Sequence, residues 1–177
     1  MAVTALVRNA RLADFPSIAA LNTGSESFLS PMNEARVERL HAWAAYHRVI
    51  QDDARVAAFL LAFREGSAYD SPNYRWFSER YESFVYIDRV VVAPAHRGKG
   101  LATFLYLDVF AFAVKSGIET VACEFDVEPP NDVSRRFHDK LGFQEVGSHS
   151  YNNKRVSMQA RARDADPAAH SSPAPRR

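Results

Sequence analysis

Residues 90–102 read Val90-Val91-Val92-Ala93-Pro94-Ala95-His96-Arg97-Gly98-Lys99-Gly100-Leu101-Ala102. A β-branched run that a proline ends predicts a strand, and the apolar spacing after the second glycine predicts a helix. The first-turn amides of such a helix have no partners inside the helix and carry partial positive charge. The two glycines lack the Cβ atoms that would keep an anion away, and the arginine and lysine add charge. The stretch therefore predicts a pyrophosphate-binding turn between a strand and a helix.

Two common phosphate-binding signatures do not fit this turn. A P-loop needs G-x-x-x-x-G-K-[ST], and the stretch lacks both that spacing and the Lys-Ser/Thr ending. A Rossmann fingerprint needs a third glycine where the chain has Thr103. The pattern that fits is [Q/R]-x-x-G-x-[G/A], which Arg97, Gly100 and Ala102 satisfy.

Three features on either side of the turn extend the pattern. The strand predicted before it ends in Val-Val-Val-Ala-Pro, and the strand predicted over Thr120–Val127 is followed by a loop with Asn131. The next predicted helix ends in Leu141-Gly142-Phe143. With these features, the chain resembles the GNAT superfamily of N-acetyltransferases over residues 4–160. Residues 69–77 and 128–131 are similar to a bacterial subgroup of predicted acetyltransferases without an assigned substrate.

The rest of the pattern predicts an α/β domain. The expected elements are a strand over Thr4–Val7, a helix after Asp14, a helix over Glu34–Ala45, hairpin strands over His47–Gln51 and Val56–Phe63, an excursion over Gly66–Ser83 with no clean period beyond that of a short helix, a strand over Phe84–Val92, a helix over Leu101–Lys115, the strand over Thr120–Val127, a helix from Val133, and strands over Phe143–Ser148 and Lys154–Ala160.

Apolar spacing predicts the buried face of two of these helices. In the helix over Leu101–Lys115 the expected face holds Leu101, Phe104, Leu105 and Phe112. In the later helix it holds Val133, Phe137 and Leu141. The resemblance implies a GNAT-like mixed, mostly antiparallel sheet with a central splayed parallel strand pair and helices on both faces. We expect one N-acetyltransferase domain over residues 4–160 and a disordered tail over residues 161–177.

Composition limits the classes of partner. The chain has 22 basic and 21 acidic side chains, so we expect no nucleic acid and no membrane as partner. Cys123 is the single cysteine and excludes an internal disulfide. The start does not have the pattern of a signal peptide, and no apolar run is long enough to span a bilayer, so we expect a cytoplasmic protein. The histidines show no metal-ligand spacing, which predicts no metal. A monomer and a homodimer both remain open.

The resemblance implies acetyl-coenzyme A (acetyl-CoA) as co-substrate. Backbone groups of Val90, Val91 and Val92 would pair with its pantetheine arm, and Asn131 would also touch that arm. An equal alternative for Asn131 is the N-cap of the following helix, and the two roles are compatible. The expected pyrophosphate-binding residues are Arg97, Gly98, Lys99, Gly100, Leu101, Ala102 and Thr103.

Acetyl transfer to an amine needs a base, because alkyl amines have pKa values of about 10 in water. Two carboxylates compete for this role: Glu124, on the strand after the coenzyme helix, and Asp88, on the strand before the turn. We favour Glu124, because some family members carry a catalytic glutamate there. The alternative for each is a structural salt bridge, with Arg89 or Arg97 for Asp88 and with Lys115 or Arg135 for Glu124.

The departing thiolate needs a proton or a hydrogen bond. Many family members place a tyrosine four residues before the glycine of the Gly-Phe pair, where this chain has His138. A neutral imidazole can donate to sulfur, and the alternative is a buried structural histidine. Cys123 faces away from Glu124 by strand alternation, which disfavours a cysteine-bound intermediate.

Two functions stay open at this stage. One is transfer of an acetyl group to a primary amine, of a small molecule or of a peptide or protein, by direct attack in a ternary complex. The other is a non-catalytic coenzyme-A-binding sensor or interaction module, which the missing tyrosine favours. The acceptor is expected near residues 23–33 and 66–83, whose aromatic side chains form either a wall for an amine or a lid on the core.

Overall fold

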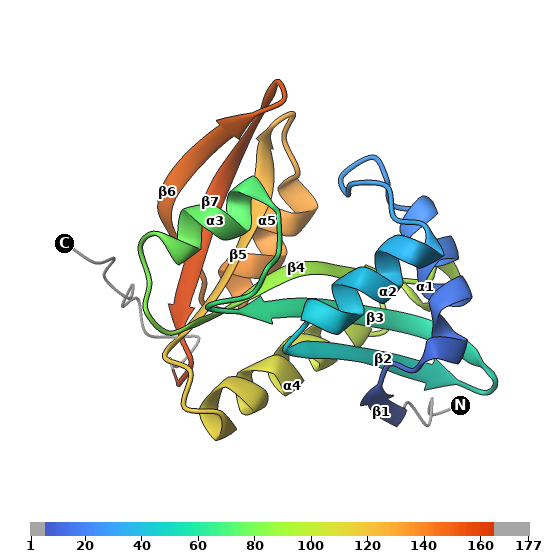
Figure 1. Ribbon diagram of the computed structural model, residues 1–177. Helices are drawn as coiled ribbons and strands as arrows, with labels where there is room; N and C mark the ends of the chain where they lie inside the picture. Colours follow the sequence, from blue (N-terminus) through green and yellow to red (C-terminus); the bar gives the residue numbers. More distant parts are fainter. Residues whose placement is uncertain (1–5, 165–177) are drawn as a thin grey trace. The chain divides into compact units, whose positions relative to one another are not determined.

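The computed structural model describes residues 6–164 of the 177-residue chain (Figure 1). In chain order the elements are β1 (Leu6–Asn9), the 3-10 helix η1 (Leu12–Asp14), α1 (Phe15–Thr23), α2 (Glu34–Trp43), β2 (Tyr46–Asp52), β3 (Arg55–Arg64), α3 (Pro72–Ser78), β4 (Phe84–Val92), the 3-10 helix η2 (Pro94–His96), α4 (Leu101–Lys115), β5 (Thr120–Glu128), α5 (Asp132–Lys140), β6 (Gln144–Tyr151) and β7 (Lys154–Ala162).

The strands are hydrogen-bonded in the order β1-β2-β3-β4-β5-β7-β6. The β4–β5 pair is parallel, whereas β1–β2, β2–β3, β5–β7 and β6–β7 are antiparallel. This is the mixed, mostly antiparallel sheet that the sequence predicts. The chain divides into two compact units, which are described in turn. The first comprises the described residues up to Phe63 together with Arg89–Val109, and the second comprises Arg64–Asp88 and the described residues from Phe110.

Most predicted elements are confirmed to within a few residues, and β4 and α4 have the predicted bounds. The last strand is longer than predicted, because β7 continues through Arg161 and Ala162. Arg161 is buried and donates to the carbonyl oxygen of Leu141, so the expected tail does not begin at residue 161. Thr4 and Ala5 of the first predicted strand, and residues 165–177 of the predicted tail, lie outside the described residues.

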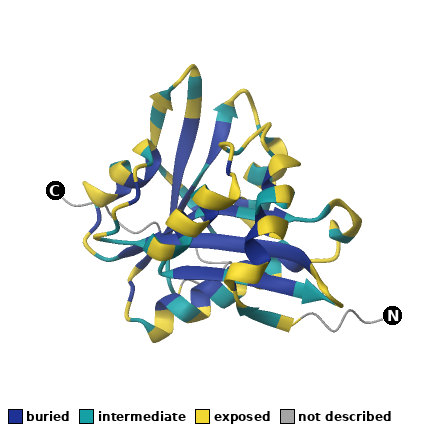
Figure 2. Ribbon diagram, turned by 45° about the vertical axis from the view of Figure 1, so that its right-hand side comes forward, coloured by how far each residue is buried: buried dark blue, intermediate teal, exposed yellow. Residues whose placement is uncertain are grey.

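In the first unit, helices cover both faces of β2. Tyr46 and Arg48 face one side, where each donates a 2.6 Å hydrogen bond to the Asp108 carboxylate of α4. His47 faces the other side, where it contacts His41 of α2 and the ring of Phe15 in α1. The neighbouring strand β3 is buried along nearly all of its length (Figure 2), as expected for a central strand covered on two faces.

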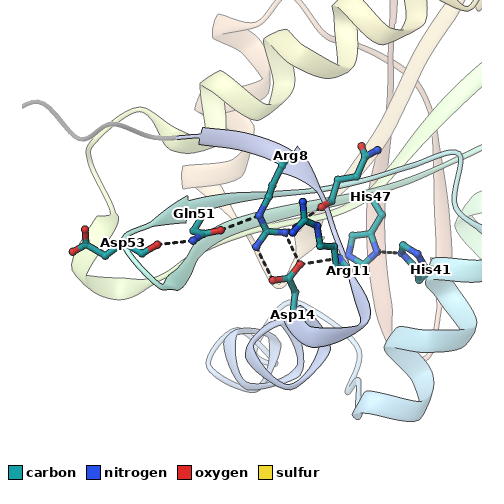
Figure 3. A network of polar contacts seen from close by, with 8 residues as sticks. Arg8, Arg11, Asp14, His41, His47, Gln51 and Asp53 are labelled. Atoms are coloured by element: carbon teal, nitrogen blue, oxygen red, sulfur yellow. Dashed lines mark hydrogen bonds and ion pairs between the residues drawn. The ribbon is translucent and has the colours of Figure 1, made fainter.

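A polar network fixes the start of the first unit (Figure 3). The Arg8 guanidinium donates to both carboxylate oxygens of Asp14 at 2.7 and 2.8 Å, and the Arg11 amide donates to the same carboxylate. The hydrogen bond from Arg8 lowers the pKa of Asp14. Burial lowers the pKa of His47 to about 3, and its Nδ1 lies 2.9 Å from Nδ1 of His41.

In the second unit, helices also cover both faces, here of β5. The amide nitrogen of Asn73 in α3 donates to Glu124 on one face. On the other face, Phe125 stacks with His138 of α5, with ring centroids 5.7 Å apart. Because Glu124 and Phe125 are consecutive, strand alternation directs one to α3 and the other to α5.

The predicted buried faces of two helices are partly wrong. Val133 of α5 is 73% exposed, which contradicts the prediction, whereas Leu141 is buried as predicted and Phe137 is half-buried. The polar His138 is also buried, which the spacing did not predict. Phe104 of α4 is 51% exposed. The buried face of α4 follows a four-residue spacing through Leu101, Leu105, Val109 and Ala113. In α4 the apolar side chains occupy more of the circumference than one face can bury, so spacing alone did not select the inward residues. In α5, Val133 lies in the first turn of the helix, where it is exposed.

A substitution at Gly147 of β6 can test how α3 packs in the second unit. A Cβ at this position would lie 2.6 Å from the indole of Trp76. We expect Gly147→Ala to lower the free energy of unfolding by about 1–3 kcal/mol, because the indole has to move. Urea unfolding measures the change.

Gly24 provides the matched control. It has a φ of −68°, and an added Cβ would meet only ordinary contact, 3.5 Å from the Leu21 carbonyl oxygen. Gly24→Ala should leave stability unchanged or slightly raised. Equal effects of the two substitutions would contradict the packing of Trp76 on Gly147.

Candidate active site

The glycine turn lies in the first unit, between β4 and α4. After β4 ends, the Ala93 amide donates to the Ala57 carbonyl oxygen at 2.8 Å, and η2 follows at once. The His96 ring then lies 2.7 Å from the Asp52 carboxylate, which ties the turn to the β2–β3 hairpin. The Arg97 side chain folds back to the Val92 carbonyl oxygen at 3.4 Å.

Two glycines of this turn adopt left-handed backbone conformations. Gly98 has a φ of 74° and Gly100 a φ of 78°, which other residues adopt only with strain. A Cβ at either glycine would meet nothing within 4 Å, so the turn is open beside the backbone. The first helical bond of α4 runs from the Phe104 amide to the Gly100 carbonyl oxygen at 3.0 Å. The amides of residues 101–103 are therefore first-turn donors, as an anion site at a helix start requires.

Strand β4 alternates between two environments before it reaches the turn. Asp88, Val90 and Val92 are half-buried, whereas Arg89 and Val91 are buried. The parallel register with β5 covers only the first three residues of β4, from Phe84↔Thr120 to Tyr86↔Ala122. The end of β4 thus continues well past its paired part, as the predicted splayed pair requires.

The second unit holds both candidate bases in one group of polar side chains. The Tyr86 hydroxyl donates to Glu124 Oε1 at 2.9 Å, and the Asn73 amide nitrogen donates to the same oxygen at 3.0 Å. The Tyr69 hydroxyl donates to Asp88 at 2.5 Å. Oε2 of Glu124 is buried and has no hydrogen-bond partner among the described residues.

Burial raises the pKa of Glu124 to about 8. The negative charges of Asp88 and Asp126 act in the same direction, whereas the hydrogen bonds from Tyr86 and Asn73 act against it. A carboxyl group with this pKa can accept a proton near neutral pH. This geometry and charge favour Glu124 over Asp88 as the base.

Glu124 does not form the salt bridges that the sequence analysis gave as its alternative role. Its partners are Tyr86 and Asn73 rather than Lys115 or Arg135, and Arg135 donates to Asp132 instead. The salt bridge predicted between Asp88 and Arg89 or Arg97 stays a prediction, and Arg89 is buried. Its guanidinium donates to Asn22 Oδ1 at 2.7 Å and to Ser30, in the first unit.

A family model decides the classification, because the description "Acetyltransferase (GNAT) family" matches residues 7–143. The chain belongs to the GNAT acetyltransferase family. The match covers β1 through α5, and so includes the glycine turn and both candidate bases.

Solved structures of acetyltransferases share the GNAT fold of this chain. Ard1 from Thermoplasma volcanium is similar with a TM-score of 0.73 and 17% identity, over 90% of this chain and 98% of that one. The ribosomal-protein-S18-alanine N-acetyltransferase from Escherichia coli is similar with a TM-score of 0.68 and 13% identity, over 92% and 96%. YncA from Salmonella typhimurium, solved with acetyl-CoA, has a TM-score of 0.68 and 18% identity, over 94% and 98%. A search of curated protein sequences found no match.

Asn131 caps α5 of this GNAT protein. Its side chain accepts a 3.1 Å hydrogen bond from the Ser134 amide, which confirms the N-cap prediction. The cap uses Oδ1 of Asn131, which leaves the side-chain amide nitrogen to donate elsewhere. The predicted contact of Asn131 with the pantetheine arm stays a prediction. Among residues 6–164, no group of three or more His, Cys, Asp or Glu side chains is arranged to hold a metal ion, and no helix has the length and apolar character to cross a membrane.

His138, at the tyrosine position of many GNAT proteins, is packed among aromatic rings. It is 4% exposed and contacts Phe125, Phe137 and Phe143. Its Nδ1 lies 2.8 Å from the Ser134 carbonyl oxygen, so the neutral ring carries its proton there. Burial lowers its pKa to about 4. These contacts favour the structural alternative, and the predicted role as acid stays untested.

Sequence reasoning missed three side chains of the carboxylate group. Tyr86 could have been found, because alternation along β4 places it on the same face as Asp88. Tyr69 and Asn73 lie in the excursion between β3 and β4, whose sequence has no regular period to fix side-chain directions. Only the folded chain reveals that they reach β4 and β5.

The raised pKa of Glu124 can be measured through stability. Between about pH 4.5 and pH 8, folded Glu124 keeps a proton that the unfolded chain has released. Its contribution to stability is therefore complete below about pH 4.5 and is lost as pH rises toward 8, by up to about 1.4 kcal/mol per pH unit. We expect Glu124→Gln to gain stability relative to the native protein across this window.

Urea unfolding of both proteins at several pH values gives the measurement. Taking the difference between the two proteins removes the contributions of groups they share, including His47 and His138, whose lowered pKa values act in the opposite direction. Parallel profiles for the two proteins would contradict the raised pKa.

Proposed function

We propose that this protein transfers an acetyl group from acetyl-CoA to a primary amine by direct attack, with Glu124 as the base. The main support for this proposal is the environment of Glu124. This residue has a buried carboxyl group with a pKa of about 8 and an Oε2 atom that no described residue binds, in a chain of the GNAT family. The acceptor is an amine of a small molecule or of a peptide or protein.

The glycine turn fits the phosphates of acetyl-CoA. Its two left-handed glycines and the first-turn amides of α4 present several N–H groups on one open side. Arg97 and Lys99 add positive charge at the same turn. The end of β4, Val90–Val92, offers its backbone to the pantetheine arm, and Asn131 offers an amide donor. The YncA neighbour was solved with acetyl-CoA, which supports the same ligand here.

Acetyl-CoA, when bound, supplies a thioester with an activated carbonyl carbon. Glu124 Oε2 removes a proton from the acceptor ammonium, which frees the nitrogen lone pair for attack. A backbone amide near Val91 or Val92 holds the carbonyl oxygen as it gains negative charge.

A cysteine-bound intermediate is unfavourable in this protein. Cys123 is 2% exposed, and burial raises the pKa of its thiol well above the ordinary value. A thiol without appreciable thiolate is a poor nucleophile. The acetyl group therefore passes directly to the amine.

Acetyl-CoA binding tests the cofactor site. We expect calorimetric titration to show binding to the native protein and a loss of about a hundredfold or more in Gly100→Glu. The added carboxylate repels phosphate, and the left-handed backbone disfavours the side chain.

Gly117→Glu is the matched control, because it creates the same charge and a similar strain at the opposite end of α4. Gly117 has a φ of 68° and an added Cβ meets nothing within 4 Å. This variant should bind acetyl-CoA as the native protein does. Absence of binding to the native protein at millimolar acetyl-CoA would overturn the proposal.

Catalysis is tested by thiol release from acetyl-CoA with a panel of primary amines. We expect Glu124→Gln to lower kcat by about 10²–10⁴-fold while acetyl-CoA still binds, because the base is lost. The kcat of the native protein should rise with pH toward an apparent pKa of about 8, and the kcat of the variant should not show this rise.

Glu119→Gln, an exposed carboxylate just before β5, is the control and should keep its activity. Acetyl-CoA binding without thiol release for any amine would instead favour the non-catalytic sensor.

A further inference from the structure

Helix α3 brings a buried amide to the carboxylate of Glu124. Ser71 caps the helix by accepting from the Tyr74 amide, and Pro72 occupies its first position, so this short segment starts a helix at a fixed point. Asn73 follows and is 2% exposed. Its Nδ2 donates to Glu124 Oε1 at 3.0 Å and to the Tyr151 hydroxyl at 3.2 Å.

The hydrogen bonds at this carboxylate are distributed unevenly. Oε1 of Glu124 accepts from both Tyr86 and Asn73, whereas Oε2 has no partner among the described residues. Oδ1 of Asn73 is also buried and also without a partner there. Oδ1 of Asn73 is an acceptor, Oε2 is an acceptor once Glu124 is ionised, and one hydrogen bond joins the two groups. Buried acceptors without a hydrogen-bond partner are unfavourable, so the pair is suited to a ligand that brings several donors.

The charges around these atoms favour a cation. The negative charges of Asp88 and Asp126 both act electrostatically on Glu124, and Lys154 forms a salt bridge with Asp126 at 3.1 Å. Within the described residues, no lysine or arginine hydrogen-bonds to Glu124. A protonated amine offers up to three N–H donors and a positive charge in one group.

We propose that Asn73 is a specificity-determining residue that contacts the acceptor: Oδ1 of Asn73 accepts one N–H of a primary ammonium while Oε2 of Glu124 accepts another. The inference rests on the proposed function, since it takes the acetyl acceptor to be the ligand of this site. It adds that Asn73 makes the site select primary over substituted amines.

The proton balance explains this selectivity. A primary ammonium gives its first proton to Glu124 Oε2, and the C–N bond forms as the C–S bond breaks, with its electron pair going to sulfur. The second proton leaves the nitrogen for the thiolate, and Glu124 returns its proton to solvent. The product amide still has one N–H, which stays on Asn73 Oδ1. A secondary amine would end as a tertiary amide without that N–H and would leave Oδ1 unpaired.

Binding of simple ammonium ions tests the proposal without acetyl-CoA. The probes are n-butylammonium and N,N-dimethyl-n-butylammonium, which carry the same charge but three N–H groups and one. Their dissociation constants are read from the ¹³C carboxyl signal of Glu124 in the full chain at fixed pH. We expect the native protein to bind n-butylammonium more tightly than the tertiary ammonium. Asn73→Leu keeps the branching of the side chain but removes its oxygen, so the ratio of the two dissociation constants should fall about tenfold.

Two further variants separate recognition from positioning. Tyr86→Phe removes the other donor to Oε1 but not Asn73 Oδ1, so it should keep the preference. Asn73→Asp restores an acceptor oxygen and should restore the preference. If Asn73→Leu does not fold, Asn73→Ala replaces it, and the affinity for n-butylammonium alone becomes the measured quantity, with about a tenfold loss expected.

The outcomes distinguish this inference from the proposed function. An unchanged preference in Asn73→Leu, or no preference in the native protein, overturns the role of Asn73 even if acetyl-CoA is turned over. A preference that depends on Asn73 supports the ammonium site even if no amine yields thiol release, in which case only the proposed transfer fails.

Discussion

The parallel pairing of β4 with β5 is the constraint on which the rest of the molecule depends. Parallel strands cannot be joined by a tight hairpin, so the chain between them has to form a crossover, and α4 is that crossover. The turn over residues 93–100 connects the end of β4 to the start of α4. The left-handed conformations of Gly98 and Gly100 make that short connection possible, and the same residues leave the helix amides open to an anion.

A second constraint comes from placing a carboxylate inside β5. Desolvation disfavours an ionised Glu124, and donors have to be brought to it. Tyr86 comes from the paired part of β4, and Asn73 comes from α3, far away in sequence. Their bonds support one carboxylate oxygen and do not cancel the effect of burial. The carboxyl group consequently has a pKa suited to moving a proton, which an exposed glutamate would not have.

How far the sequence predicts the fold varies along the chain. The bounds of β4 and α4 follow from a β-branched run, a proline and a glycine turn, which are local signals of high specificity. The inward face of α5 did not follow completely, because the apolar Val133 is exposed whereas the polar His138 is buried. His138 illustrates the same limit. Its position in the sequence suggests an acid, which stays a prediction, and only the fold shows its aromatic neighbours and its bond to Ser134.

The sequence by itself determined the glycine turn, the order of strands and helices, and the family to which they point. Each of these depends on residues that are close together along the chain, where backbone preference and strand or helix period act directly. Tertiary structure alone decided the environment of the two carboxylates. The protonation of Glu124 depends on burial and on donors from β4 and α3, and such long-range desolvation leaves no periodic trace in the sequence.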